Sequence, residues 1–165
     1  MNARQPVRII GMGNFFAGDD AVGILVARQL KALAIDGVDI IEAGLAGFDL
    51  LDLLEGTEAA IVIDAVQNGI DPGTILRLEI PRHLEQVSAL SWSSSLSSTH
   101  GLGLGEALTL GITLGTLPPS LTIYGIELGH IAQGEPLSRS VLEAIDIFLP
   151  QLVKEIEKLA CTNFS

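Results

Sequence analysis

The stretch that decides the fold is IIGMGNFFAGDDAVG, residues 9–23. It opens with an apolar run, turns at Gly11 and Gly13, and reaches the acidic pair Asp19 and Asp20 before residues typical of a helix. This layout predicts a buried strand, a tight turn and a helix, with carboxylates at the carboxyl end of a central strand. Open α/β sheets bind their ligands at that edge.

The same stretch is similar to the glycine fingerprint of dinucleotide-binding proteins but departs from it at one position. After Gly11 and Gly13 the fingerprint requires a third glycine, where this chain has Phe16. A dinucleotide site directs backbone N–H groups at phosphate, whereas two adjacent carboxylates repel phosphate and attract a cation. The segment favours a cation site, with a nucleotide-binding α/β protein as an alternative.

Strand and helix patterns continue to alternate after this segment. We expect strands at 7–12, 38–42 and 59–66, separated by helices at 20–33 and 48–54. A β-α-β-α-β order predicts parallel strands in a doubly wound sheet. In the flavodoxin-like order 2-1-3, the first and third strands are neighbours.

The second half of the chain has a different pattern. Residues 67–73 are rich in turn formers and too short for a parallel crossover, which needs about a dozen residues or more. Residues 74–80 are therefore expected to return antiparallel at the edge of the sheet. The serine-rich segment 88–99 has no clean period and predicts a mobile loop. The remaining expected elements are a helix at 103–114, a strand at 121–126, and a helix at 137–159 with a kink or restart at Pro150.

Composition limits the class of protein. With 165 residues, 48% of them apolar, the chain is expected to form a single domain over residues 1–165 with a substantial core. The 20 acidic and 9 basic residues give a net charge of −11 without a basic cluster, which argues against binding to nucleic acid or to anionic membranes. No apolar run is long enough for a membrane span, and the first residues lack a signal-peptide core, so a cytoplasmic protein is expected. Its one cysteine, Cys161, excludes an internal disulfide.

Three residues at separate positions could form a cation site. Asp20 follows the first strand, Asp64 interrupts the apolar run of the third strand, and His100 closes the serine-rich segment. A carboxylate in a buried strand costs on the order of several kcal/mol unless it is paired or bound to a metal. If the serine-rich segment returns over the sheet edge, these side chains would meet. Two carboxylates and an imidazole suit a divalent metal such as nickel, zinc or iron, with positions open for a substrate.

Several polar residues have simpler interpretations. Asp19 is expected to cap the first helix, and Asp20 could complement the helix dipole. We expect Asn14 to fix the turn through its amide. His83 and His130 are expected to be surface or hydrogen-bonded histidines. The chain has no Gly-x-Ser-x-Gly elbow, which disfavours a serine hydrolase of that type.

Four motifs, in order, resemble those of the [NiFe]-hydrogenase maturation endopeptidases. They are GMGN with DDAVG (residues 11–23), EAGLAG (42–47), IDA (63–65) and THGL (99–102), and they extend over nearly the whole chain. The resemblance implies an α/β fold: a three-layer α/β/α sandwich, phosphorylase/hydrolase-like, around a five-stranded, mostly parallel twisted sheet with one antiparallel strand.

The resemblance also implies an activity. Members of this family are peptidases, filed near the aspartic-type endopeptidases. They remove a C-terminal extension from the precursor of a hydrogenase large subunit after nickel insertion. The family's metal-contacting positions fall on Asp20, Asp64 and His100, which are then the expected catalytic and metal-contacting residues. The nickel is carried by the substrate, and other divalent ions could occupy the site. The second motif departs from the family at 43–45, where two glycines and a Thr or Ser are common.

Two questions stay open on these residues. The nickel could act in catalysis or only as a recognition mark for the precursor. A chaperone that recognises the metal of the large subunit, without cleaving it, is a further alternative. A monomer is expected, because the acidic composition gives no sign of an obligate dimer.

Overall fold

The computed structural model describes residues 6–14, 16–44, 49–93, 103–129 and 134–162. The elements, in chain order, are β1 (Val7–Met12), the 3-10 helix η1 (Gly18–Ala21), α1 (Val22–Ala32), β2 (Val38–Gly44), α2 (Asp49–Leu54), β3 (Ala59–Val66), β4 (Ile75–Ile80), α3 (Leu84–Ala89), α5 (Leu104–Leu114), β5 (Ser120–Glu127) and α6 (Arg139–Thr162).

The sheet has the strand order β2-β1-β3-β5-β4. β1 pairs in parallel with β2 and β3, β3 pairs in parallel with β5, and β4 runs antiparallel to β5. The expected neighbourhood of the first and third strands is confirmed, and so is the antiparallel edge strand. The connection between β3 and β4 is too short to cross over the sheet, so β4 returns along the far side of β5.

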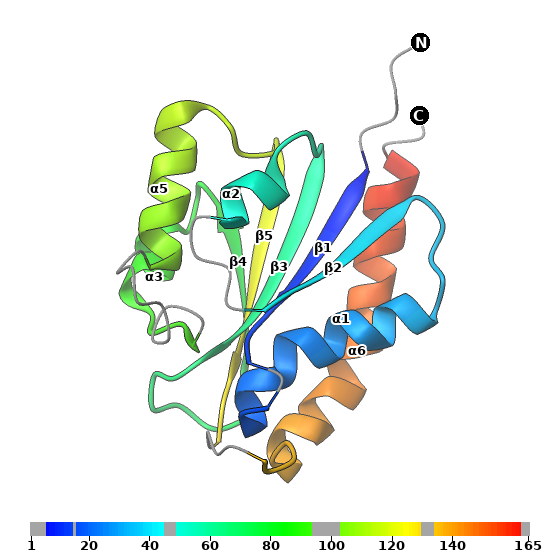
Figure 1. Ribbon diagram of the computed structural model, residues 1–165, viewed down its shortest axis with the longest axis vertical. Helices are drawn as coiled ribbons and strands as arrows, with labels where there is room; N and C mark the ends of the chain where they lie inside the picture. The colour runs from blue at the N-terminus through cyan, green and yellow to red at the C-terminus, as the bar shows by residue number, and fades with distance from the viewer. Residues whose placement is uncertain (1–5, 15, 45–48, 94–102, 130–133, 163–165) are drawn as a thin grey trace.

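Helices cover both faces of the sheet, with α1 and α6 on one face and α2, α3 and α5 on the other (Figure 1). Successive residues of a strand point to opposite faces. Accordingly, Ile9 and Ile61 pack with α1 and α6, whereas Ile10 and Val62 pack with the other helices. β3 is buried at every position because it is the central strand of the sheet and helices cover both faces. The expected three-layer α/β/α arrangement is confirmed.

The start of α1 lies unusually close to the sheet. A Cβ on Gly23 would lie 2.3 Å from the carbonyl oxygens of Met12 and Ile63, and a Cβ on Gly11 would lie 2.2 Å from the carbonyl oxygen of Gly23. Only residues without a side chain permit this approach. The helix therefore begins directly against the carboxyl ends of β1 and β3.

The serine-rich segment differs from its prediction. Residues 84–89 form α3, and Trp92 is buried, with its indole N–H donating to the carbonyl oxygen of Val87 at 2.8 Å. Trp92 also forms an isolated antiparallel bridge with Val66. A mobile loop is therefore wrong for residues 88–93, because Trp92 fastens them to the sheet. Residues 94–99 lie outside the described part of the chain.

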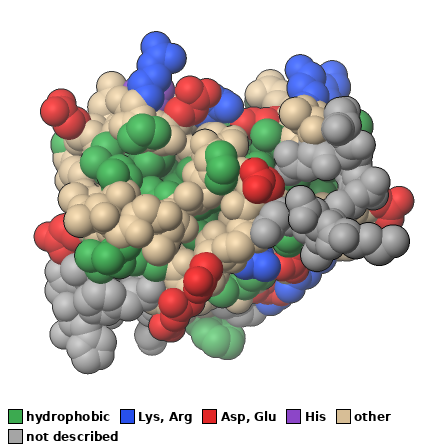
Figure 2. Space-filling view, turned by 90° about the horizontal axis from the view of Figure 1, so that it is seen from above, with side chains coloured by type: hydrophobic (Ala, Val, Ile, Leu, Met, Phe, Trp, Pro, Cys, Tyr) green, Lys and Arg blue, Asp and Glu red, His purple; other side chains and the backbone are tan. Residues whose placement is uncertain are grey.

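The last helix also differs in detail. α6 is one helix that continues through Pro150, so the expected restart is wrong. Within the described ranges, no helix has the length and apolarity that crossing a membrane requires. Figure 2 shows the end of the molecule near the amino ends of the parallel strands, where acidic and basic side chains form small separate groups among apolar ones.

Candidate functional site

Two of the three predicted site residues lie at the carboxyl ends of the parallel strands, at the lower side of Figure 1. Asp64 is two residues from the end of β3 and has no exposed surface. Asp20 lies in η1, which contacts β3, and is 3% exposed. The structure thus brings both carboxylates to the same edge of the sheet.

The histidines are only partly covered by the structure. His100, the third predicted site residue, lies outside the described residues, and so does His130. His83 accepts a hydrogen bond at Nδ1 from the backbone N–H of Glu79 at 2.9 Å, as expected for a hydrogen-bonded histidine. Among the described residues, no group of three His, Cys, Asp or Glu side chains could hold a metal ion.

The glycine turn after β1 uses its backbone N–H groups internally. Gly13 donates to the carbonyl oxygen of Gly44 at 3.0 Å, and Asn14 donates to that of Asp20 at 3.1 Å. The side-chain oxygen of Asn14 accepts from the N–H of Phe16 at 3.1 Å, which confirms its expected part in the turn. These donors are not directed at a phosphate, so the geometry disfavours the nucleotide-binding alternative.

The same turn requires a glycine at position 13. Gly13 has φ +134°, a conformation that side chains disfavour. A Cβ there would lie 2.0 Å from the carbonyl oxygen of Asp20. The second glycine of the motif therefore lets the chain fold back tightly enough to place Asp20 beside β3.

The Asp20 carboxylate has a hydrogen-bond partner that the sequence patterns did not reveal. The Ser93 hydroxyl donates to Asp20 Oδ1, and both side chains are buried. Burial raises the pKa of Asp20 above its usual value, while the Ser93 hydroxyl and the Asn14 backbone N–H oppose the rise. The fold therefore disfavours the ionised form of this carboxyl.

We expect Asp20→Asn to increase the free energy of unfolding more at pH 7 than at pH 4. The folded pKa lies above the ordinary value of 3.8, so the unfolded chain ionises first as the pH rises. Ionisation then costs the folded state a penalty that is absent below 3.8 and complete above the raised pKa. Asparagine avoids this penalty and can still accept from Ser93. Urea unfolding at both pH values measures the difference, and a variant less stable than the parent at pH 7 would contradict the expectation.

Asp19 has a different position from the one predicted. η1 has Ala17 at its N-cap with no side-chain cap bond, so the expected capping by Asp19 is wrong. The buried Asp19 carboxylate instead accepts from the N–H of Ser138 at 2.6 Å, the N–H of Gly129 at 2.6 Å and the hydroxyl of Ser138 at 2.8 Å. Its side chain therefore points to the connection between β5 and α6. Asp19 thus joins the first motif to the C-terminal part of the chain.

We expect Asp19→Asn to lower the free energy of unfolding by about 1–3 kcal/mol, the range for leaving a buried polar group unsatisfied. An amide has only one acceptor oxygen, so it cannot serve all three donors. Urea unfolding measures the change. Asp146→Asn removes an exposed carboxylate on α6 and is the control. Equal stabilities for the two variants would refute the role assigned to Asp19.

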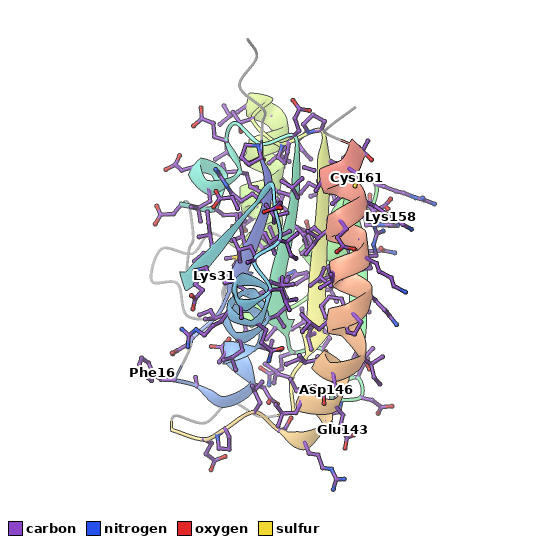
Figure 3. The ribbon with its side chains drawn as sticks, turned by 90° about the vertical axis from the view of Figure 1, so that its right-hand side faces the viewer. Phe16, Lys31, Glu143, Asp146, Lys158 and Cys161 are labelled. Carbon is purple, nitrogen blue, oxygen red and sulfur yellow. The ribbon has the colours of Figure 1, made fainter. Side chains whose placement is uncertain are left out.

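An exposed aromatic side chain lies close to this site in the sequence. The N–H of Phe16 is bound by Asn14, and its carbonyl oxygen accepts from the N–H of Gly134 at 2.9 Å. The ring is nevertheless 72% exposed, and Figure 3 shows it pointing away from the body of the molecule. The backbone thus holds an apolar side chain outward four residues before Asp20.

Comparisons with known proteins agree on one family. Residues 24–157 match the family HycI, hydrogenase maturation protease; that range includes Asp64 and begins just after Asp20. The hydrogenase 2 maturation protease of Escherichia coli (strain K12) is 31% identical over 123 residues, which is 73% of this chain and 71% of that protein. The hydrogenase expression/formation protein HupD of Thiocapsa roseopersicina is 27% identical over 77% of this chain, but the match spans only 56% of its length.

A solved structure supports the same relationship. The [NiFe] hydrogenase maturation protease HybD from Thermococcus kodakarensis superposes with a TM-score of 0.69 and 25% identity. The superposition covers 94% of this chain and 99% of that one. The expected five-stranded α/β fold is therefore also the fold of solved relatives.

Proposed function

Because the chain belongs to the hydrogenase maturation proteases, a family of peptide-bond hydrolases, we propose that it removes a C-terminal extension from the precursor of a [NiFe]-hydrogenase large subunit. The observation that carries the proposal is the pair of buried carboxylates, Asp20 and Asp64, at the carboxyl edge of the sheet. We further propose that a single copy of the chain acts in the cytoplasm.

The site residues are proposed to recognise nickel that the precursor already contains. Asp20, Asp64 and His100 would contact that nickel, which belongs to the substrate. Carboxylate and imidazole donors suit such a divalent ion. The Asp64 side chain has a fixed orientation, because its Oδ1 accepts from the N–H of Ala65 at 2.9 Å. A fixed carboxylate at the end of a strand can hold the metal, and with it the adjacent peptide, in one position.

Precursor docking would involve the surface beside these carboxylates. Phe16 is held outward by its backbone and offers an apolar contact for an arriving segment. The two parts would have separate roles: the carboxylates would recognise the metal, and the surface at Phe16 would contact the precursor polypeptide near that metal.

The test is to incubate a purified candidate precursor with the chain and to follow the mass of the large subunit by mass spectrometry. We expect loss of the C-terminal extension from nickel-loaded precursor and no loss from nickel-free precursor. Asp20→Ala and His100→Ala should process poorly. Equal processing of both precursors would refute recognition through nickel, and undiminished processing by both variants would refute the assigned site.

The same experiment separates the remaining alternative. A stable complex with nickel-loaded precursor, without cleavage, would identify a chaperone of the large subunit and would overturn the proposed peptidase activity. Size-exclusion chromatography of the mixture detects such a complex.

A further inference from the structure

The Ser93 side chain, which is distant from Asp20 in the sequence, binds the Asp20 carboxylate. Its hydroxyl donates to Asp20 Oδ1 across 73 positions of sequence, and Ser93 is 1% exposed. A buried hydroxyl that donates to a buried carboxylate fixes the orientation of that carboxylate. This effect on Asp20 requires that Ser93 itself has a fixed position.

The two residues before Ser93 are bound to the sheet and to the turn that follows β3. Gln67 donates its N–H to the carbonyl oxygen of Ser91 at 2.9 Å, and the N–H of Ser91 donates to the side-chain oxygen of Asn68 at 3.1 Å. Trp92 packs on β5, where a Cβ on Gly125 would lie 3.1 Å from the indole ring. The segment 91–93 is thus anchored to the ends of β3 and β5.

A buried carboxylate fixes the turn at Asn68, which binds Ser91. Glu127, at the end of β5, accepts at Oε1 from the backbone N–H groups of Asn68 and Gly69 at 2.9 and 3.0 Å. Glu127 therefore holds the turn that carries Asn68, Asn68 holds Ser91, and Ser93 follows two residues later. This path of contacts gives Ser93 a position set by the sheet.

We propose that Ser93 is a positioning residue for the proposed reaction, and that its hydroxyl orients Asp20 toward the nickel carried by the precursor. The inference rests on the proposed function. A carboxylate has about four lone-pair sites, so Oδ1 can keep the Ser93 hydrogen bond while the carboxylate contacts a metal. Hydrogen-bond partners of this kind orient metal ligands, and their loss typically lowers metal affinity or activity by about 10–100-fold.

Three substitutions test the proposal. Ser93→Ala removes the hydroxyl, Ser93→Thr keeps it, and Ser91→Ala removes the hydroxyl of an exposed serine two residues away. Ni²⁺ alone is titrated calorimetrically into each free chain, and kcat and KM are measured with nickel-loaded precursor. For Ser93→Ala we expect Ni²⁺ affinity and kcat/KM to fall by about 10–100-fold, with the loss mainly in KM. Ser93→Thr should recover most of both quantities, and Ser91→Ala should match the parent.

The outcomes separate the inference from the function on which it rests. A parent chain that processes precursor while Ser93→Ala retains its full KM and Ni²⁺ affinity overturns the inference alone. A parent chain that does not process precursor overturns the proposed function, and the inference with it. If the titration of Ni²⁺ into the free parent chain gives no heat, the comparison of KM between the parent and Ser93→Ala decides. If Ser93→Ala does not fold, Ser93→Cys replaces it; the thiol is a weak donor, and an undiminished kcat/KM for that variant would count against Ser93.

Discussion

Asp64→Asn is expected to lower the processing of nickel-loaded precursor by more than about 100-fold while leaving the chain folded. The effect should exceed the 10–100-fold loss typical of partners that only orient a ligand, because Asp64 is proposed to contact the metal itself. An asparagine has nearly the same shape and can still accept the N–H of Ala65 through its side-chain oxygen. The rate of extension removal, followed by mass spectrometry, is the measurement.

The matched control is Asp71→Asn, which makes the same chemical change at an exposed aspartate in the turn between β3 and β4. We expect it to process precursor at the parental rate. Thermal unfolding of both variants checks that the loss is chemical. Parental activity in Asp64→Asn would remove Asp64 from the site, whatever the result for Asp20.

Gly23→Ala is expected to lower the free energy of unfolding by at least about 3 kcal/mol, at the upper end for overpacking. In a helix, alanine is favoured over glycine by up to about 1 kcal/mol, so propensity alone predicts stabilisation. The added Cβ would lie 2.3 Å from two carbonyl oxygens, and backbone atoms of β1 and β3 cannot move aside as a flexible side chain can. α1 would have to shift away from the sheet. Urea unfolding measures the change.

A control for this prediction is Gly115→Asn. Gly115 follows α5 with φ +66° and has no neighbouring atom within 4 Å of a built Cβ. Asparagine is tolerated in that conformation, so its cost should stay below about 1 kcal/mol. If Gly23→Ala is as mild as this control, the close approach of α1 to the sheet does not limit stability.

Most of the sheet could be predicted because its signals are local. β1 and β3 are mostly apolar runs, and the short connection after β3 predicts the antiparallel return of β4. Asp64 is conspicuous for the same reason, since it interrupts a run that is otherwise apolar. The four motifs also predicted the family that the comparisons found.

The contacts that hold the site were harder to predict, because their partners are distant in sequence. The donors to Asp19 are 110 and 119 positions away, so its carboxylate looked like a helix cap. Ser93 belongs to a serine-rich stretch without periodicity, and its burial depends on Trp92 and on the turn at Asn68. Local patterns contain no information on such contacts. The functional assignment of Asp20, Asp64 and His100 stays a prediction.

The hydrogen bonds between Asp19 and residues 129 and 138 determine how late in synthesis on the ribosome the site can complete its fold. The first motif emerges early, yet the donors that satisfy its buried carboxylate emerge only with the final third of the polypeptide. β4 likewise has its sheet partner β5 only after some forty further residues have been added. A nascent or truncated chain that ends before Gly129 therefore lacks the donors that bind the Asp19 carboxylate, and one that ends before Ser120 also lacks the partner strand of β4. We expect a truncated fragment of this kind to be inactive toward a precursor, and a nascent chain to become active only when its synthesis is nearly finished.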